Sequence, residues 1–295
     1  MTAHFVRTDT IYRDIINAPD AETRQQSYIS QLIEPWQNMM QMVAGADNDN
    51  PLAGAEQWHW LLPSQLMDTP QILTDLETMD AWTIGAQALE KGMGTLSALG
   101  EKMPFDSVEG WLILADAERA DPIMRGYTGG IDFMRPRLLC QYDTLTPANA
   151  RALPGCVVHE LNHLVRLRLF PWDMQATSVA DYIIHEGIAE SFAGALFGDD
   201  VLGHYVTDFD EAQIDHAREQ VGKALDTTGF GIIRSYIFGD TWAKKLGLPL
   251  VGMPDYGGYA IGYRVVQAYL ERTGCSIVEA TGTPAKTIIA ESGYF

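Results

Sequence analysis

The sequence predicts an α+β fold that is mainly helical and carries a small β-sheet. Apolar residues recur at helical spacing through much of the first hundred residues and again after residue 146. Between them, about 35 residues contain a short apolar run and a glycine-rich stretch, which are typical of strands and turns. The 295 residues are 46% hydrophobic and 20% charged, so the chain has the composition of a globular protein that buries a real core.

Residues 1–105 are predicted to form a helical N-terminal region. One helix is expected from about residue 21 to residue 43, where the turn-forming stretch 45–51 ends it. A second helix is expected to start with Thr69 as N-cap and Pro70 in its first position. The character of the sequence changes near residue 105, so we place a domain boundary there, with a second domain over 106–295.

The segment after this boundary contains the predicted strands. Residues 108–115 form a short apolar run that suits a buried strand. Residues 125–130 read as a glycine-rich loop, and 131–142 as a further strand. Pro136 lies inside that segment, and because proline cannot donate to a ladder, we expect an edge strand there.

The rest of the chain is predicted to be helical. Thr146 and Pro147 open one helical segment, and Pro154 is expected to interrupt it and start a fresh helix to about Arg168. Later helices are predicted over about 178–196, 208–225 and 257–272, the last being the final long helix.

Charge and cysteine content exclude several partners and environments. Asp and Glu outnumber Lys and Arg by 39 to 20, so a phosphate backbone or an anionic membrane surface would be repelled. No apolar run is long enough to span a membrane, and the N-terminus has no apolar stretch of signal-peptide length. Three widely spaced cysteines do not form a disulfide framework. We therefore expect a cytoplasmic protein that binds neither nucleic acid nor membrane.

The chemistry-bearing motif is His-Glu-x-x-His at residues 159–163. On a helix, His159 and His163 lie one turn apart on one face, so their imidazoles can share one Zn²⁺. Glu160 lies beside them, where it can activate a metal-bound water. The competing interpretation is an amphipathic helix with two hydrogen-bonded histidines.

A catalytic zinc needs a third protein ligand, and the next predicted helix offers carboxylates. Glu186 and Glu190 are four residues apart on a helix that is otherwise apolar. Buried carboxylates need partners, and a metal or a histidine is one. Glu186 with His159 and His163 would complete a site of two histidines and one glutamate. The alternative for both glutamates is a solvated helix face.

These motifs resemble those of the gluzincin metallopeptidases, in which the Glu of an Asn-Glu-Gly-x-Ala segment is the third zinc ligand; that position corresponds to Glu186. The chain from about Trp111 onward is more similar to a bacterial family of predicted zinc-dependent proteases whose domain has no assigned function. The matching pieces are HELNHLVR (159–166), HEGIAESFA (185–193) and GYAIGYRVVQAYL (258–270). The resemblance implies a zincin-like catalytic core, zinc and peptide hydrolysis. His185 replaces the asparagine of the aminopeptidase pattern.

Supporting residues are proposed around this set. Tyr259 and Tyr263 begin the last long helix, and either can stabilise the oxyanion of the tetrahedral intermediate; Tyr263 is favoured over Tyr259 and the adjacent Arg264. Packing of both tyrosines is the alternative.

Further roles are expected near the two motif helices. Glu190 is expected to hydrogen-bond a zinc histidine, and Arg166 to neutralise that carboxylate. For Cys156, core packing is favoured over metal ligation. The strand near residues 130–139 can bind an extended peptide by β-strand addition.

The sequence therefore predicts a zinc metallopeptidase that hydrolyses peptide bonds through a zinc-bound water activated by Glu160. Its partner would be a peptide or protein substrate. The first alternative is a catalytically inactive, zinc-stabilised protein that binds peptides or proteins. A weaker one is a hydrolase that acts on a non-peptide amide.

Overall fold

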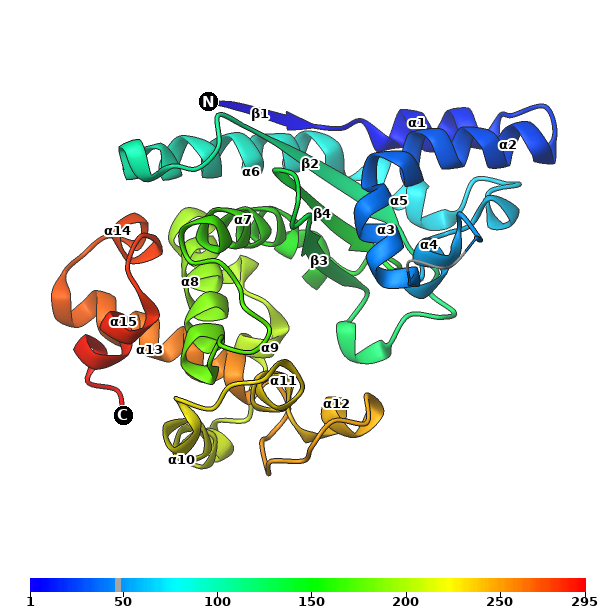
Figure 1. The fold of residues 1–295 in the computed structure, drawn as a ribbon. Helices are drawn as coiled ribbons and strands as arrows, with labels where there is room; N and C mark the ends of the chain where they lie inside the picture. Colours follow the sequence, from blue (N-terminus) through cyan, green and yellow to red (C-terminus); the bar gives the residue numbers. More distant parts are fainter. Residues whose placement is uncertain (46–48) are drawn as a thin grey trace. The chain divides into compact units, whose positions relative to one another are not determined.

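A computed structural model describes residues 1–45 and 49–295 of the chain (Figure 1). The fold is mainly helical with one four-stranded sheet, which confirms the predicted α+β class. The chain divides into two compact units, Met1–Met93 with Phe105–Glu160 and Gly94–Pro104 with Leu161–Phe295. The domain boundary at residue 105 stays a prediction. No helix in the described ranges is long and apolar enough to cross a membrane.

The N-terminal region is helical except at its start, where a short strand joins the sheet. The predicted helix over 21–43 consists of two helices joined by a π-helical turn and a 3₁₀ turn, and the second predicted helix begins at residue 71, with Pro70 rather than Thr69 as its N-cap. The elements are β1 (Thr2–Phe5), α1 (Thr8–Ile16), α2 (Ala21–Tyr28), α3 (Gln37–Ala44), α4 (Ala53–Gln57), α5 (Gln71–Thr78) and α6 (Ala81–Leu96).

The sheet contains β1, β2 (Ser107–Leu114), β4 (Arg137–Tyr142) and β3 (Tyr127–Ile131), in that spatial order. β2 is parallel to both β1 and β4, whereas β3 runs antiparallel to β4 and forms the edge. The edge-strand prediction for 131–142 was wrong, because Pro136 lies in the turn just before β4 and has no ladder N–H to lose. Its carbonyl still accepts a hydrogen bond from the Glu109 N–H at 2.9 Å.

The long helix α7 (Pro147–Leu169) carries the His-Glu-x-x-His motif. Its start follows the predicted capping logic, since Thr146 and Asn149 each accept a backbone N–H of the other. The predicted break at Pro154 was wrong, and the helix continues through it. Leu153 and Val157 are fully buried on either side, so packing stabilises the helix despite the hydrogen bond that proline removes.

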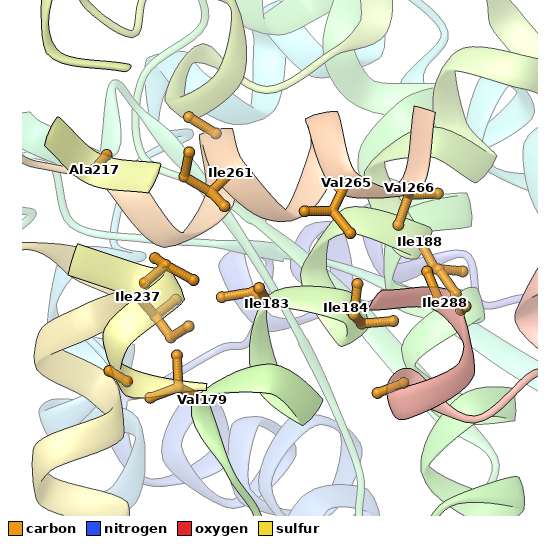
Figure 2. Close-up of a cluster of buried hydrophobic side chains, with 14 of the residues drawn as sticks. Val179, Ile183, Ile184, Ile188, Ala217, Ile237, Ile261, Val265, Val266 and Ile288 are labelled. Carbon is orange, nitrogen blue, oxygen red and sulfur yellow. The ribbon is translucent and has the colours of Figure 1, made fainter. Parts of the chain in front are cut away.

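The second unit is built on α8 (Val179–Phe197) and α13 (Gly257–Thr273). Figure 2 shows aliphatic side chains of both helices meeting in one cluster, with Ile237 and Ile288 among their neighbours. The predicted last helix corresponds to α13, but two short helices follow it. The other helices are α9 (His204–Thr207), α10 (Ile214–Ala224), α11 (Phe230–Phe238), α12 (Asp240–Lys245), α14 (Ile277–Thr281) and α15 (Ala285–Ser292).

Two glycines allow α8 and α13 to cross at backbone contact. A Cβ added to Gly187 would lie 2.2 Å from the carbonyl oxygen of Gly262, and one added to Gly262 would lie 2.0 Å from that of Ile183. No side chain fits at either position. Because Gly187 directly follows Glu186, this crossing fixes the part of α8 that carries the predicted third ligand.

Candidate metal centre

One turn of α7 brings three potential metal-binding groups together. His159, Glu160 and His163 are all buried, and one ligand atom from each lies within 4.8 Å of the others. The spacing of four residues between the histidines places both on one helix face, as the sequence predicted. Several surrounding positions are apolar and fully buried, among them Leu161 and Val165. The helix therefore presents a polar cluster from a buried, rigid element.

Glu186 of α8 lies against one of these histidines. Its Oε2 is 3.2 Å from Nε2 of His163, and both side chains are more than nine-tenths buried. Helix α8 begins with a capping box in which Ser178 and Asp181 bond each other's backbone N–H, which fixes the register of the helix. Glu186 is thus a buried carboxylate beside a metal-ligand candidate, and the alternative of a solvated helix face was wrong.

The geometry fits a shared metal ion. Two ligands at about 2.0–2.1 Å from a tetrahedral zinc lie about 3.3 Å from each other. The 3.2 Å separation between His163 Nε2 and Glu186 Oε2 matches that value. Two imidazoles and one carboxylate are also the donor set of several catalytic zinc sites. The three residues therefore suit zinc by donor type, and the pair His163 and Glu186 suits it by spacing. The ligand atoms that lie within 4.8 Å of one another are those of His159, Glu160 and His163.

His185 supports the same histidine from the other side. Its ring stacks on the His163 ring at a centroid distance of 3.9 Å, with the planes 13° apart. Trp172 in turn packs edge-on against His185, at 6.3 Å between centroids. The His163 ring is therefore oriented by its two neighbours on α8, the carboxylate of Glu186 and the ring of His185.

The edge strand β3 lies directly against Glu160. A Cβ added to Gly129 would lie 2.2 Å from Oε1 of Glu160 and 2.6 Å from its Cγ and Cδ. Only glycine leaves room for this carboxylate. The sequence showed a glycine-rich stretch here, but nothing in it indicated a contact with a residue 31 positions later.

Two polar residues of α7 anchor the helix to the α14 region. The buried Asn162 amide donates to Oγ1 of Thr281 at 3.0 Å. Nη1 of Arg166 donates to the carbonyl oxygens of Thr281 and Thr283, at 2.9 and 3.0 Å. The prediction that Arg166 neutralises Glu190 was wrong, because its position on the helix directs the guanidinium to the carbonyl ends of α14.

Glu190 holds the start of α9. Its carboxylate accepts the backbone N–H of Gly203 and the Tyr205 hydroxyl, the latter at 2.8 Å. Hydrogen bonding of Glu190 to a zinc histidine stays a prediction. Tyr205 also packs on Tyr259 at 4.4 Å between centroids, so Tyr259 belongs to an aromatic cluster.

Tyr263 is half-buried on α13. Burial raises the pKa of its hydroxyl, and the negative charges of Asp199 and Glu190 raise it further. Tyr263 therefore stays protonated at neutral pH and can donate a hydrogen bond. Its role as oxyanion donor stays a prediction.

Cys156 lies one turn before His159 and contacts another cysteine. A hydrogen bond with Cys140 of β4, together with burial, raises the pKa of the Cys156 thiol well above its usual value. Among the described residues, the clustered ligand groups are His159, Glu160 and His163 without Cys156, which agrees with the packing role favoured for this cysteine.

Comparisons with known proteins identify the family of the chain. Residues 84–290 match the family described as "Predicted Zn-dependent protease (DUF2268)". "Uncharacterized protein YjfC" of Bacillus subtilis (strain 168) is 35% identical over 186 residues, which are 62% of this chain and 60% of that protein. The similarity thus spans less than two thirds of the relative's length. No solved structure matches the chain significantly. Because the family match covers more than half of the chain and contains all of α7, α8 and α13, this chain belongs to the family of predicted Zn-dependent proteases.

Proposed function

We propose that the protein is a zinc metallopeptidase in which His159, His163 and Glu186 hold the metal. The observation that carries the proposal is the contact between Glu186 and His163 at 3.2 Å, one helical turn from His159. Burying a carboxylate is costly unless its charge is compensated. A divalent cation shared by the three residues would compensate Glu186 together with its contact to His163, and the family description agrees with zinc.

Glu160 has a separate role, as the proton carrier. Zinc at such a site acts as a Lewis acid that lowers the pKa of water to about 7 and polarises a carbonyl group. Glu160 accepts the proton of the attacking water and passes it to the leaving amine nitrogen, as a general base and then a general acid. The Glu160 side chain packs directly against Gly129 of β3, which confines it between α7 and this strand.

The edge strand beside Glu160 supports a peptide as the proposed substrate. β3 has β4 on one side only, so its other edge can pair with an extended peptide by β-strand addition. A peptide bound there would have its backbone next to the Glu160 carboxylate. Tyr263, and secondarily Tyr259, are the proposed donors to the oxyanion, because the Tyr263 hydroxyl is protonated at neutral pH.

The variant Glu160→Gln tests the mechanism. The amide keeps the shape of the side chain but cannot accept the proton, so hydrolysis of a peptide library should fall by at least about 100-fold, within the usual contribution of a general base. Zinc content, measured by elemental mass spectrometry, should be unchanged. Unchanged turnover would remove Glu160 from the mechanism.

The wild type tests the reaction class in the same assay. Bound zinc with no cleavage of any peptide would favour the alternative of a zinc-stabilised, inactive binding protein. Cleavage of amide substrates other than peptides would favour a non-peptide amidase.

A further inference from the structure

A cavity opens beside the candidate metal centre, at the C-terminal end of α7. Its volume is about 370 Å³, within the range of small-molecule sites. The residues that line it come from α7, the loop before α8, α8 itself and the first turn of α15, all in the second unit. His185 contributes to its wall and also stacks on His163. The ring of His185 therefore connects the cavity wall to a proposed metal ligand.

Arg166 gives this cavity a buried positive charge. The side chain is 3% exposed and lines the cavity, and its guanidinium lies 4.7 Å from the centroid of the Phe170 ring. All its hydrogen bonds to described residues leave from Nη1 and end on backbone carbonyl oxygens. No carboxylate of the described residues forms an ion pair with Arg166. No acceptor among them takes a hydrogen bond from its Nε or Nη2. The fork geometry that matches a carboxylate is thus unused.

The charge on Arg166 persists at neutral pH. Burial lowers the pKa of its guanidinium to about 10, and the nearby Asp181 opposes that shift. Among the described residues, no carboxylate is hydrogen-bonded to this buried cation, and an incoming anion that bonded it would lower the cost of its burial. Lys286 on the cavity wall adds a second positive charge.

The acidic residues of the cavity are occupied by local hydrogen bonds. Asp173 accepts the backbone N–H groups of Gln175 and Ala176, at 2.7 and 2.8 Å. Asp181 accepts the backbone N–H and the hydroxyl of Ser178 in the capping box. These carboxylates therefore cap backbone, whereas the two cations have donors to spare.

Apart from Thr177, the remaining wall is apolar. It includes Leu169, Phe170, Pro171, Trp172, Ala176 and Ala285. The cavity thus suits a ligand that presents one anionic group on an apolar body. An amino-acid residue with a carboxylate has that chemistry.

We propose that this cavity is a substrate subsite in which Arg166, assisted by Lys286, binds a carboxylate of the peptide. The proposal rests on the proposed peptidase function. Arg166 follows His163 by three residues, an axial distance of about 4.5 Å on a helix. An extended peptide advances about 3.3 Å per residue, so the carboxylate belongs one or two residues from the scissile bond. It is either the C-terminal carboxylate or an Asp or Glu side chain.

The test is direct binding, which needs no turnover. Three probes are titrated calorimetrically into the full chain as purified: N-acetyl-phenylalanine, its amide, and N-acetyl-glutamic acid α-amide. At least one carboxylate probe should bind about tenfold or more tightly than the neutral amide, as expected for charge-assisted hydrogen bonds. If N-acetyl-phenylalanine binds most tightly, the subsite takes the C-terminal carboxylate of the peptide. If N-acetyl-glutamic acid α-amide binds most tightly, it takes an Asp or Glu side chain. Equal affinities for all three overturn the proposal.

Two substitutions locate the bound carboxylate. Arg166→Lys removes the forked guanidinium but keeps the positive charge. Lys286→Glu changes an exposed side chain, so the circular dichroism spectrum of this variant should match that of the wild type. Lys286→Glu should reduce the affinity advantage of the acid over the amide severalfold. The control is Arg168→Ala, which changes an exposed residue of α7 outside the cavity and should leave that advantage unchanged. An advantage that survives both cavity variants places the carboxylate elsewhere, on the metal for instance, and overturns the proposal.

If peptide cleavage is found, kcat/KM for a peptide acid and its amide gives a separate readout. Cleavage without any preference for a carboxylate contradicts the subsite but leaves the peptidase function intact. Carboxylate binding without cleavage contradicts the function but leaves the cavity assignment intact.

Discussion

Replacing Gly129 with alanine tests whether Glu160 acts where the structure places it. The added Cβ would lie 2.2 Å from Oε1 and 2.6 Å from Cδ of Glu160, whereas carbon atoms pack at about 3.5–4.0 Å. The carboxylate must therefore move by about 1 Å or more. Because the clash involves the end of a side chain and not backbone, the fold should be preserved.

A displacement of about 1 Å at a reacting group costs on the order of 100-fold in rate. Gly129→Ala should accordingly lower kcat/KM for a peptide by about that factor, with zinc content and the circular dichroism spectrum unchanged. The matched control is Gly130→Ala on the same strand, whose Cβ would meet Leu139 at 3.8 Å, an ordinary contact. Its kcat/KM should stay within about twofold of wild type.

Two results would contradict the role assigned to Glu160 beside Gly129. If Gly129→Ala hydrolyses peptides as fast as Gly130→Ala, the Glu160 carboxylate does not act from the position seen against β3. If Gly129→Ala instead unfolds, the strand and not the carboxylate is what the glycine protects.

Two further predictions concern the metal ligands and the helix crossing. Glu186→Ala should weaken zinc binding, measured by chelator competition, more than Glu190→Ala does, because Glu186 contacts His163 while Glu190 bonds Gly203 and Tyr205; the reverse order would reassign the third ligand. Gly262→Ala should lower the free energy of unfolding in urea by at least about 1–3 kcal/mol, because its Cβ would lie 2.0 Å from a carbonyl oxygen of α8. Gly94→Ala in α6, whose Cβ would meet nothing within 4 Å, should instead be neutral or stabilising by up to about 1 kcal/mol; similar losses in both would disprove the steric explanation.

Local sequence signals predicted the elements that carry the motif. The pair Ser178 and Gly198 marks the ends of α8 by capping, and the spacing of His159 and His163 needs only the helix itself. These features depend on residues a few positions apart. Sequence reasoning therefore placed α8 and the three groups of α7 correctly, but it did not predict the continuous helix through Pro154.

Predictions of features that depend on long-range packing were absent or wrong. Pro154 is a helix breaker by propensity, yet α7 continues because the residues around it are buried. Pro136 suggested an edge strand, but the edge is β3, since the order of strands is set by pairing between distant segments. Arg166 and Glu190 have opposite charges, but each bonds groups far along the chain that no spacing rule indicates.

The central claim is that His159, His163 and Glu186 form a zinc site. Metal content by elemental mass spectrometry, on protein purified without a histidine tag, tests it directly, with wild type measured beside His163→Ala. We expect about one zinc per wild-type chain and its loss in the variant, because the substitution removes His163 Nε2, which lies 3.2 Å from Glu186 Oε2. A wild type that holds no metal, even after zinc is added back and the protein dialysed, would contradict the account.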